Sequence, residues 1–537
     1  MENLPTTEGS TSIIQNPILR GFNPDPSIVR VDNDYYIATS TFEWFPGVQI
    51  HHSKDLVNWE LVKRPLDRIE LLDMRGNPDS GGIWAPCLTH SDGLFYLIYT
   101  NVRSWDDGPY KVSYNYLTTA PNIEGPWSDP IFLTGSGFDP SLYHAEDGRK
   151  WLLNMIWDHR PSNNSFAGIL LQEYCPKARK LVGPVKNIFQ GTDLGLVEGP
   201  HLYEKDGYYY LVTAEGGTQY EHAATVARST NIDGPYEVCP HNPLTCAFEA
   251  ADAPLKKTGH GSLVDTPDGE WYFVHLCGRP IDGKHCPLGR ETGIQKVDWP
   301  EGEWPALSHG GSVPALKAPA PNRYQAAAKV AAPFSQHVAF DSDQLNIHFQ
   351  SLRRPFSEDW LSLTARPDWL RLYGQEPTVS RFDQSLIARR LQSFNADVET
   401  CIDFTPPTFQ QMAGLIAYYD TANHFYLRIS QDERLGRSLN IIQCQGRETI
   451  MVLTQDISIP DEGLVYLAAN IETTYLQFKY SMDGENWTRI GPQLPMKVLS
   501  DDYFKLGFTG AFLGLCAQDI SCHGHHADYR YFKYSER

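Results

Sequence analysis

Hydrophobic and polar residues alternate in five segments of the first three hundred residues, and all five have the same form. A small polar start is followed by an apolar pair, a turn with Asp, Asn or Gly, and a strand rich in aromatic residues. Alternation on both sides of a short turn predicts a β-hairpin. The five hairpins are PDPSIVRVDNDYYIATS from Pro24, APCLTHSDGLFYLIYT from Ala85, FDPSLYHAEDGRKWLLNM from Phe138, EGPHLYEKDGYYYLVTA from Glu198 and GHGSLVDTPDGEWYFVH from Gly259.

The hairpins recur at a regular interval. Aligned on Pro26, Pro86, Pro140, Pro200 and Gly261, they are separated by 60, 54, 60 and 61 residues. Each interval leaves room for two more strands. The repeat therefore predicts blades of four strands, and five such blades form a β-propeller. Unrelated hairpins in a sandwich are the alternative, which the regular spacing disfavours.

The pattern changes after the fifth repeat. Residues 309–333 are rich in Ala and Pro, as is typical of a linker. From residue 334 onward short alternating strands recur with few helical patterns, which predicts a β-sandwich. We therefore predict an all-β chain with a five-bladed propeller at 14–308, a linker at 309–333 and a C-terminal sandwich of jelly-roll or lectin-like type at 334–537.

Composition and charge narrow the range of partners. Asp and Glu number 65 against 45 Lys and Arg, a net charge of −20. Phosphate backbones and anionic membranes repel such a chain, so we expect neither nucleic acid nor a membrane as partner. No run approaches the roughly 20 apolar residues of a membrane span. The start lacks the apolar stretch of a signal peptide, and the ten cysteines have no tight spacing pattern. These features favour a cytoplasmic protein with a neutral ligand.

Equivalent positions of the repeats carry candidate chemistry. The innermost strand of each blade lines the channel of a propeller, so these positions meet near one point. Asp25, Trp84, Asp139, Glu198 and His260 lie at or close to them. Taken singly, each carboxylate also fits a turn or a solvated strand end. Because buried charges are costly, their arrival at matching positions indicates a functional site.

A set of three carboxylates around one pocket points to glycoside hydrolysis. That reaction needs one protonated carboxyl group for the leaving oxygen and one ionised partner. A third carboxylate near the acid would raise its pKa by like-charge repulsion. The sequence supplies the three groups and leaves their separations open.

At these residues the chain resembles glycoside hydrolase family 43, in particular its two-domain β-xylosidases with a C-terminal β-sandwich. The resemblance spans roughly residues 16–534 and implies a five-bladed propeller, in agreement with the repeat count. The motifs are NPDPS (Asn23–Ser27), STFEWFPGVQI (Ser40–Ile50), GGIWAPC (Gly81–Cys87), GFDPSLY (Gly137–Tyr143), EGPHLY (Glu198–Tyr203), GHGSLV (Gly259–Val264), LGRETG (Leu288–Gly293) and FTGAFLGL (Phe508–Leu515).

The resemblance implies a role for each polar residue. Asp25 matches the general base that activates water, and Glu198 matches the general acid that protonates the leaving oxygen. Asp139 matches the third carboxylate, which tunes the pKa of the acid and orients it. Arg290 resembles the arginine that binds sugar hydroxyls in the −1 subsite, a task that suits its fork of donors. A structural salt bridge is the alternative for Arg290.

The resemblance also implies the walls of the pocket. Phe42, Trp84 and Trp157 resemble aromatic residues that accept the apolar face of a sugar, although blade packing is the commoner use of such residues. Phe512 resembles the residue with which the sandwich closes the pocket, and a closed pocket favours exo cleavage. His260 resembles an axial histidine near a calcium or water site. We expect no required cofactor, with a structural or activating Ca²⁺ near His260 as the one candidate metal.

These expectations describe an inverting, exo-acting xylan 1,4-β-xylosidase that releases D-xylose from the non-reducing ends of β-1,4-xylooligosaccharides. An α-L-arabinofuranosidase, or an enzyme with both activities, is the alternative within the family. A sugar-binding propeller without catalysis is a remote alternative, because binding does not need three carboxylates. An interaction scaffold of WD40 or kelch type has shorter repeats of about 40–50 residues. The resemblance further implies a homo-oligomer, either a dimer or a tetramer.

Overall fold

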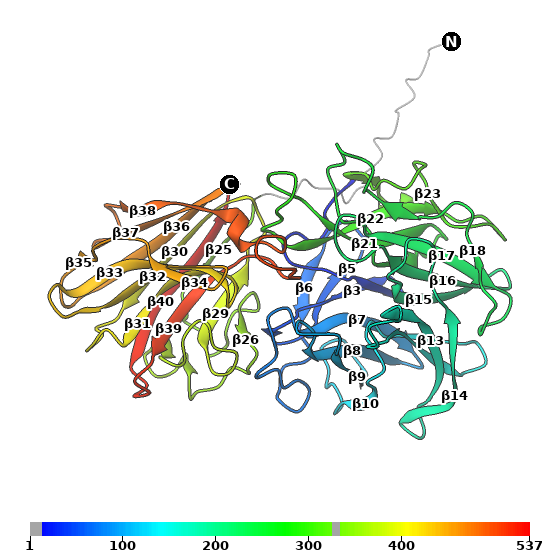
Figure 1. Ribbon diagram of the computed structural model, residues 1–537, viewed down its shortest axis with the longest axis horizontal. Helices are drawn as coiled ribbons and strands as arrows, with labels where there is room; N and C mark the ends of the chain where they lie inside the picture. The colour runs from blue at the N-terminus through cyan, green and yellow to red at the C-terminus, as the bar shows by residue number, and fades with distance from the viewer. Residues whose placement is uncertain (1–12, 325–332) are drawn as a thin grey trace, which may run out of the picture.

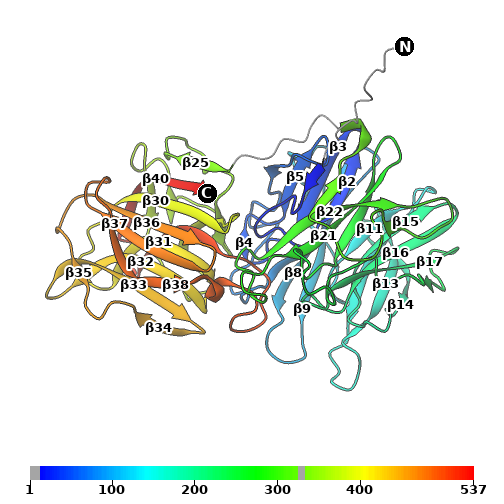
Figure 2. The same cartoon turned by 90° about the horizontal axis from the view of Figure 1, so that it is seen from above.

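A computed structural model describes residues 13–324 and 333–537 of the chain as two β-rich domains that lie side by side (Figures 1 and 2). The N-terminal domain is a five-bladed β-propeller and the C-terminal domain is a β-sandwich, as predicted. Residues 325–332 of the expected linker lie outside the described residues. In the described part of that segment, a short strand and one 3-10 turn follow the last blade.

Every blade is an antiparallel sheet whose strands follow one another along the chain, except that one short strand is left out of the first blade. The first two blades are β2 (Ser27–Val31), β3 (Asp34–Thr39), β5 (Gln49–Ser53) and β6 (Glu60–Lys63), then β7 (Gly82–Ser91), β8 (Leu94–Ser104), β9 (Val112–Ala120) and β10 (Ile131–Thr134). The third is β11 (Ser141–His144), β12 (Lys150–Trp157), β13 (Phe166–Cys175) and β14 (Lys180–Phe189). The last two are β15 (Glu198–Lys205), β16 (Tyr208–Glu215), β17 (Ala223–Ser229), β18 (Glu237–Val238) and β19 (Thr245–Cys246), then β20 (Gly261–Asp265), β21 (Trp271–Gly278), β22 (Arg290–Asp298) and β23 (Ala306–Leu307).

The predicted turn chemistry explains the inner hairpins. Asp92 and Gly93 join β7 to β8, and Asp206 and Gly207 join β15 to β16. All four have positive φ, between 52° and 78°. A two-residue turn with positive φ at both positions matches the right-handed twist of the flanking strands. These two turns thus set the register of their hairpins locally. The inner strands β2, β7, β11, β15 and β20 come to surround the channel.

Short strands outside the blades connect the ends of the propeller. β1 (Ile13–Gln15) pairs with β24 (Lys317–Pro319), which precedes the 3-10 turn η1 (Asn322–Tyr324). This pairing joins the beginning of the described chain to the segment that leaves the fifth blade. The two segments pack on the apolar residues of blades one and five.

The sandwich consists of two antiparallel sheets. The first contains β25 (Ser335–Val338), β27 (Leu361–Ser362), β28 (Leu370–Tyr373), β30 (Asn395–Asp403), β36 (Val465–Glu472), β37 (Tyr475–Ser481), β38 (Thr488–Pro495) and β40 (His526–Glu536). The second contains β26 (Gln350–Leu352), β29 (Ser385–Arg390), β31 (Gln411–Asp420), β32 (Asn423–Asp432), β33 (Gly436–Gln445), β34 (Glu448–Met451), β35 (Ile457–Ser458) and β39 (Phe512–Asp519). The 3-10 turn η2 (Met496–Leu499) follows β38.

One strand of the propeller half belongs to the second sheet of the sandwich. β4 (Trp44–Phe45), between β3 and β5, pairs with β26 and extends that sheet (Figure 2). Around it, apolar side chains from both domains form one continuous buried cluster that includes Phe42, Trp84, Tyr418 and Phe508. Burial of apolar area stabilises such a contact by about 25 cal/mol per Å². The sandwich is therefore docked firmly against the mouth of the propeller.

Candidate active site

The residues at equivalent repeat positions meet in one pocket on the propeller axis. Asp25 and Asp139 stand two residues before β2 and β11, and His260 directly precedes β20. Glu198 begins β15, and Trp84 is the third residue of β7. Each therefore stands at or near the start of an inner strand. The pocket is lined by Asp25, Phe42, Trp84, Phe138, Asp139, Glu198, Thr218, His222, His260, Arg290 and Phe508.

Asp25 and Asp139 share an uncommon backbone conformation. Their φ angles are 56° and 53°, in the left-handed region that non-glycine residues seldom occupy. Such a conformation costs of the order of 1–3 kcal/mol and is found at sites where the surrounding structure imposes it. Both are followed by proline. The same local geometry at two repeat positions turns both carboxylates into the pocket.

Asp25 is held by one partner from its own blade and one from the fifth blade. Its Oδ2 accepts a hydrogen bond of 2.6 Å from the Ser40 hydroxyl, and its Oδ1 lies 3.2 Å from Nη1 of Arg290. The same Nη1 donates to Thr218, while the other arm of the guanidinium donates to the carbonyl of Phe508 at 3.1 Å. The arrangement orients Asp25 and pairs it with a cation that is itself fixed on three sides.

Glu198 and Asp139 have raised pKa values. Burial and then the negative charge of Asp25 raise the pKa of Glu198 to about 8, against the attraction of Arg290 and Lys111. Burial and then the charges of Glu198 and Asp25 hold the pKa of Asp139 well above its usual range. The two groups titrate as a pair. The pair therefore holds at least one proton at neutral pH, as an acid catalyst requires.

Two histidines complete the floor of the pocket without adding charge. Burial and then Arg290 lower the pKa of His260 to about 3, and burial and His260 lower that of His222 to about 3. The Nε2 of His222 accepts the backbone N–H of His260 at 2.8 Å, so its Nδ1 carries the proton and donates to Gly217. Both rings are neutral donors and acceptors rather than cations.

The residues around His260 do not make up a metal site by themselves. Its Nδ1 lies 3.9 Å from Asp25 and 4.0 Å from Asp139. Calcium takes six to eight oxygen ligands in general. In residues 13–324 and 333–537, no group of three or more His, Cys, Asp or Glu side chains is placed to hold a metal ion. The side chains near His260 thus do not fit the calcium ion that the resemblance implies.

The sandwich contributes to the wall of the pocket, but through a different residue from the one predicted. Phe512, the first residue of β39, is fully buried and stacks on Trp44 at 3.7 Å, away from the pocket. Phe508 lines the pocket instead, with its ring 5.7 Å from Phe42 and 5.3 Å from Trp84. Strand pairing fixes Phe512 within the sheet, whereas Phe508 lies in the preceding loop, which reaches the propeller.

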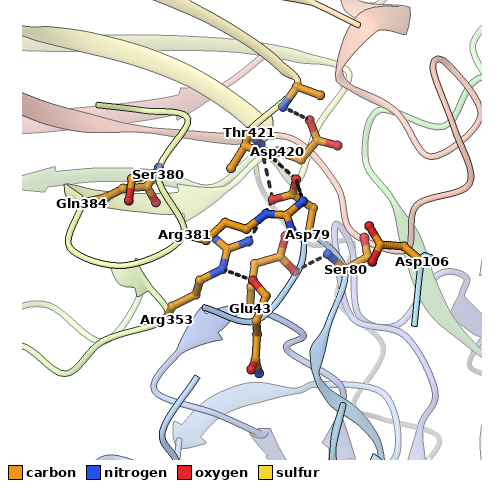
Figure 3. A network of polar contacts seen from close by, with 12 residues as sticks. Glu43, Asp79, Ser80, Asp106, Arg353, Ser380, Arg381, Gln384, Asp420 and Thr421 are labelled. Carbon is orange, nitrogen blue, oxygen red and sulfur yellow. Dashed lines mark hydrogen bonds and ion pairs between the residues drawn. The ribbon is translucent and has the colours of Figure 1, made fainter. Parts of the chain in front are cut away.

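A buried charge network anchors the sandwich beside this wall (Figure 3). Asp79 of the propeller accepts a hydrogen bond of 2.8 Å from Arg353 of the sandwich and another from Thr421. Arg381 lies 3.6 Å from the other oxygen of the same carboxylate. Two guanidinium groups and one carboxylate thus meet where the two domains touch.

Ser80 links the network to the pocket wall. Its backbone N–H donates to Glu43, which lies near Arg353 in the network (Figure 3). Its hydroxyl accepts the backbone N–H of Phe508 at 3.0 Å, and its carbonyl accepts the indole N–H of Trp84 at 2.8 Å. The position of Phe508 therefore depends on the docking of the sandwich.

Trp157 lies in a second compartment outside the inner pocket. This cavity of about 510 Å³ is also lined by Trp105 and Lys111, and it shares Trp84 and Glu198 with the inner pocket. The Lys111 ammonium stands 4.3 Å from the centre of the Trp157 ring. Glu198 thus lies at the junction between an inner and an outer compartment.

Sequence reasoning missed several residues of the pocket. Phe138 precedes Asp139 within a motif already singled out, so its repeat position could have identified it. Thr218 and His222 lie between β16 and β17, in a segment without a repeat signal. Phe508 begins the FTGAFLGL motif, but nothing in its local pattern distinguishes it from Phe512.

Comparison with known proteins agrees with this architecture. The family described as "Glycosyl hydrolases family 43" matches residues 14–305. The domain described as "Beta xylosidase C-terminal Concanavalin A-like domain" matches residues 337–535. A "Beta-xylosidase" of Bacillus subtilis is 52% identical over 98% of this chain and 100% of its own length. A "Xylosidase/arabinosidase 43B" of Humicola insolens is 51% identical over 97% of each chain.

Solved structures show the same arrangement of the two domains. The crystal structure of a xylan β-1,4-xylosidase from Bacillus halodurans superimposes with a TM-score of 0.94 at 54% identity, and covers 97% of this chain and 100% of that one. A family match over more than half of the chain and relatives above 50% identity leave no other assignment. The chain is a member of glycosyl hydrolase family 43.

Proposed function

We propose that the protein is an exo-acting, inverting glycoside hydrolase that releases D-xylose from the non-reducing ends of β-1,4-xylooligosaccharides. The observation that carries this proposal is the position of Glu198. It lies where the inner and outer compartments join, and its pKa is raised to about 8. A general acid must stand between the sugar that is released and the group that leaves.

In the proposed reaction, the terminal xylose occupies the inner pocket and the remaining chain occupies the outer compartment. Asp25 removes a proton from water, whose oxygen forms a bond to the anomeric carbon. The bond from that carbon to the glycosidic oxygen breaks, and Glu198 donates its proton to the leaving oxygen. Exchange of protons with solvent then restores both carboxyl groups. Because water attacks from the face opposite the leaving group, the anomer inverts.

The neighbouring residues support the two catalytic groups. Arg290 orients Asp25 through their ion pair and presents donors to sugar hydroxyls. Asp139 keeps negative charge or a shared proton next to Glu198 and so favours its protonated form. The rings of Phe42, Trp84 and Phe508 offer apolar faces to the sugar and restrict the access of water.

Exo action is proposed from the closure of the inner pocket. Phe508 of the sandwich and the inner strands of the propeller enclose it, so that a chain end enters more readily than an internal residue of a polymer. The only lining side chain contributed by the sandwich is Phe508, among the described residues. This explains in physical terms why the two domains occur together.

A time course of xylotriose hydrolysis by proton NMR tests the proposal. Early α-xylose would establish hydrolysis, exo action and inversion together. Early β-xylose would show retention and would contradict Asp25 as a base for water. Xylobiose binding without turnover would instead favour the non-catalytic sugar-binding propeller.

The second candidate is α-L-arabinofuranosidase activity, alone or together with xylosidase activity. It is favoured by the name of the Humicola insolens relative, a xylosidase/arabinosidase that is 51% identical. Comparison of kcat/KM for the nitrophenyl glycosides of the two sugars distinguishes the candidates. A ratio above one for the arabinoside would reverse the main proposal.

Metal dependence, assembly and compartment belong to the same proposal. We infer that no cofactor is needed, and loss of activity in EDTA with recovery in Ca²⁺ would contradict this. The homo-oligomer, a dimer or tetramer, is tested by light scattering during gel filtration.

All ten cysteines are free, which supports a reducing, cytoplasmic location. Among the described residues, no helix has the length and apolar character needed to cross a membrane.

A further inference from the structure

A second large cavity lies between blade one of the propeller and the sandwich, and it is separate from the active-site pocket. It measures about 540 Å³, within the range of roughly 300–1,000 Å³ that is typical of small-molecule sites. Its polar lining includes four arginines and two histidines, and one of the arginines, Arg20, is paired with Glu536. We call it the arginine cavity, defined by Arg64, Arg389, Arg390, His51 and His348.

The three guanidinium groups are buried and have only neutral partners. Arg64 donates to the Gln49 side chain at 2.6 Å and to backbone carbonyls. Arg389 donates to the side chains of Gln336 and Gln392 at 2.9 and 2.7 Å.

Arg390 completes the trio with the carbonyl of Phe22 at 2.6 Å and the side chain of Gln350. The side chains of the three arginines are only 1–6% exposed. Within the described ranges 13–324 and 333–537, none of the three forms an ion pair with a carboxylate.

Several polar atoms of this cluster lack a partner altogether. The Nε of Arg389, the Nη2 of Arg390 and the Nδ1 of His51 are buried and accept or donate no hydrogen bond among the described residues. A buried polar atom without a partner costs about 1–3 kcal/mol, and more when the group is charged. These three atoms belong to side chains that line the cavity, and none of them has a protein partner among the described residues.

The acidic groups near the cavity do not supply that partner. Glu536 is paired with Arg20 at 2.9 Å, although its charge also reaches Arg389. Glu60 lies at the rim, with 75% of its side chain exposed, and faces His52 at 3.7 Å. The charges of Arg20, Arg64, Arg389 and Arg390 therefore exceed those of the two carboxylates by two.

Burial also lowers the pKa values of several groups in this cluster. Burial lowers the pKa of Arg64 to about 9 and that of Arg389 to about 10. Burial and then the neighbouring arginines lower the pKa of His348 to about 3. For Arg64 and Arg389 the lowered pKa reflects the cost of burying a cation, and for His348 it also reflects the nearby arginines. A guanidinium group in water keeps its proton up to a pH of about 12.5 or higher, so an anion is the effective means of neutralisation.

We propose that the arginine cavity is a binding site for a small oxyanion of the phosphate type, either the free ion or the phosphate group of a phosphomonoester. Guanidinium forks match the oxygens of phosphate in pairs. Beside these groups, Val57, Trp59 and Leu61 give the cavity an apolar wall, which suits the carbon skeleton of an ester.

The site has a structural consequence for the active-site pocket. Gln49, which accepts from Arg64, also donates to Asn23 at 2.7 Å, two residues before Asp25. Since the cavity is lined by both domains, a bound oxyanion holds the propeller and the sandwich together. Binding therefore stabilises the closed arrangement.

Phosphate titrations of the full-length protein test the proposal. We expect one equivalent to bind in calorimetry and the melting temperature to rise with phosphate or sulfate until saturation, with sodium chloride at equal ionic strength giving no comparable rise. Tighter binding of β-glycerophosphate than of phosphate would identify an ester as the ligand, and equal or weaker binding would identify the free ion. Absence of a saturable effect would overturn the proposal.

Single substitutions test whether phosphate binds in the arginine cavity. Arg64→Met removes one guanidinium, and we expect it to reduce the affinity for phosphate at least tenfold while it folds normally without phosphate. Arg149→Met, at an exposed site paired with Asp147 far from the cavity, is the matched control and keeps the wild-type response. If Arg64→Met fails to fold, anomalous scattering from selenate in wild-type crystals decides: density among the three arginines supports the site, and density elsewhere or none refutes it.

Discussion

The active-site pocket gathers three carboxylates around the guanidinium of Arg290, whereas the arginine cavity gathers three guanidinium groups around neutral oxygens. Both regions bury like charges, and both contain side chains of blade one. They differ in the means by which the repulsion is relieved. A carboxyl group has an ordinary pKa near 4, so a rise of a few units lets it take up a proton at neutral pH.

A guanidinium group has no such route, because its ordinary pKa is about 12.5 or more. Crowded carboxylates thus become acid catalysts, while crowded guanidinium groups become a site for an anion. A third region shows paired charges: in the network of Figure 3, the carboxylate of Asp79 pairs with the guanidinium groups of Arg353 and Arg381. Charges that are paired in this way hold domains together and are not available for chemistry.

Removal of one carboxyl group from the active-site pocket should change the catalytic activity more than any other substitution considered below. Glu198→Gln cannot donate a proton, and we expect kcat/KM for xylobiose to fall by about 10²–10⁴-fold. A substrate with a dinitrophenolate leaving group needs no proton from the enzyme, so kcat/KM for that substrate should fall much less. Glu146→Gln, at an exposed turn, serves as the control. An equal loss on both substrates would assign Glu198 another role.

Substitutions in the network of paired charges around Asp79 should change the stability of the protein more than its catalytic activity. Asp79→Asn leaves Arg353 buried without its carboxylate, and we expect a loss of about 3–5 kcal/mol in the free energy of unfolding. The double variant with Arg353→Met should recover part of it. Asp268→Asn, which breaks an exposed pair with Arg323, should cost at most about 1 kcal/mol. Chemical denaturation measures all three, and equal losses for Asp79→Asn and Asp268→Asn would refute the distinction.

The two phenylalanines of the sandwich should separate catalysis from packing. Phe512→Ala removes a fully buried ring and should cost about 3–5 kcal/mol of stability. Phe508→Ala opens the pocket wall and should lower kcat/KM about tenfold or more, as expected when a contact worth roughly 1.5–3 kcal/mol is lost. Its effect on stability should be the smaller of the two. A larger loss of kcat/KM in Phe512→Ala than in Phe508→Ala would instead identify Phe512 as the residue that closes the pocket.

The smallest expected effect is a shift of the pH profile. Since the pKa of Glu198 is raised to about 8, kcat/KM should fall as the pH increases through that value and the acid loses its proton. The Lys111 ammonium lowers this pKa, so Lys111→Met should move the alkaline limb to higher pH by a fraction of a unit. Lys497→Met, at an exposed position, should leave the limb in place. A shift to lower pH would contradict the assignment of the limb to Glu198.

The part of the site that sequence analysis identified consists of repeated positions. Asp139 lies 114 residues after Asp25 and Glu198 lies 59 residues after Asp139, yet each stands within two residues of the start of an inner strand. Regular spacing was enough to bring them together, because every blade of a propeller presents its first strand to the axis. Thr218 and His222 escaped detection, since a loop that reaches the pocket once leaves no periodic signal.

The sequence by itself determined the all-β class, the five blades and the convergence of the carboxylates, because strand alternation and turn residues act over short, local stretches. Only the tertiary structure decided between Phe508 and Phe512, and only it revealed the arginine cavity. Arg64 and Arg390 are separated by more than three hundred residues, in different domains. Their proximity follows from how two finished domains pack, and the charge of a buried group depends on that environment rather than on its sequence neighbours.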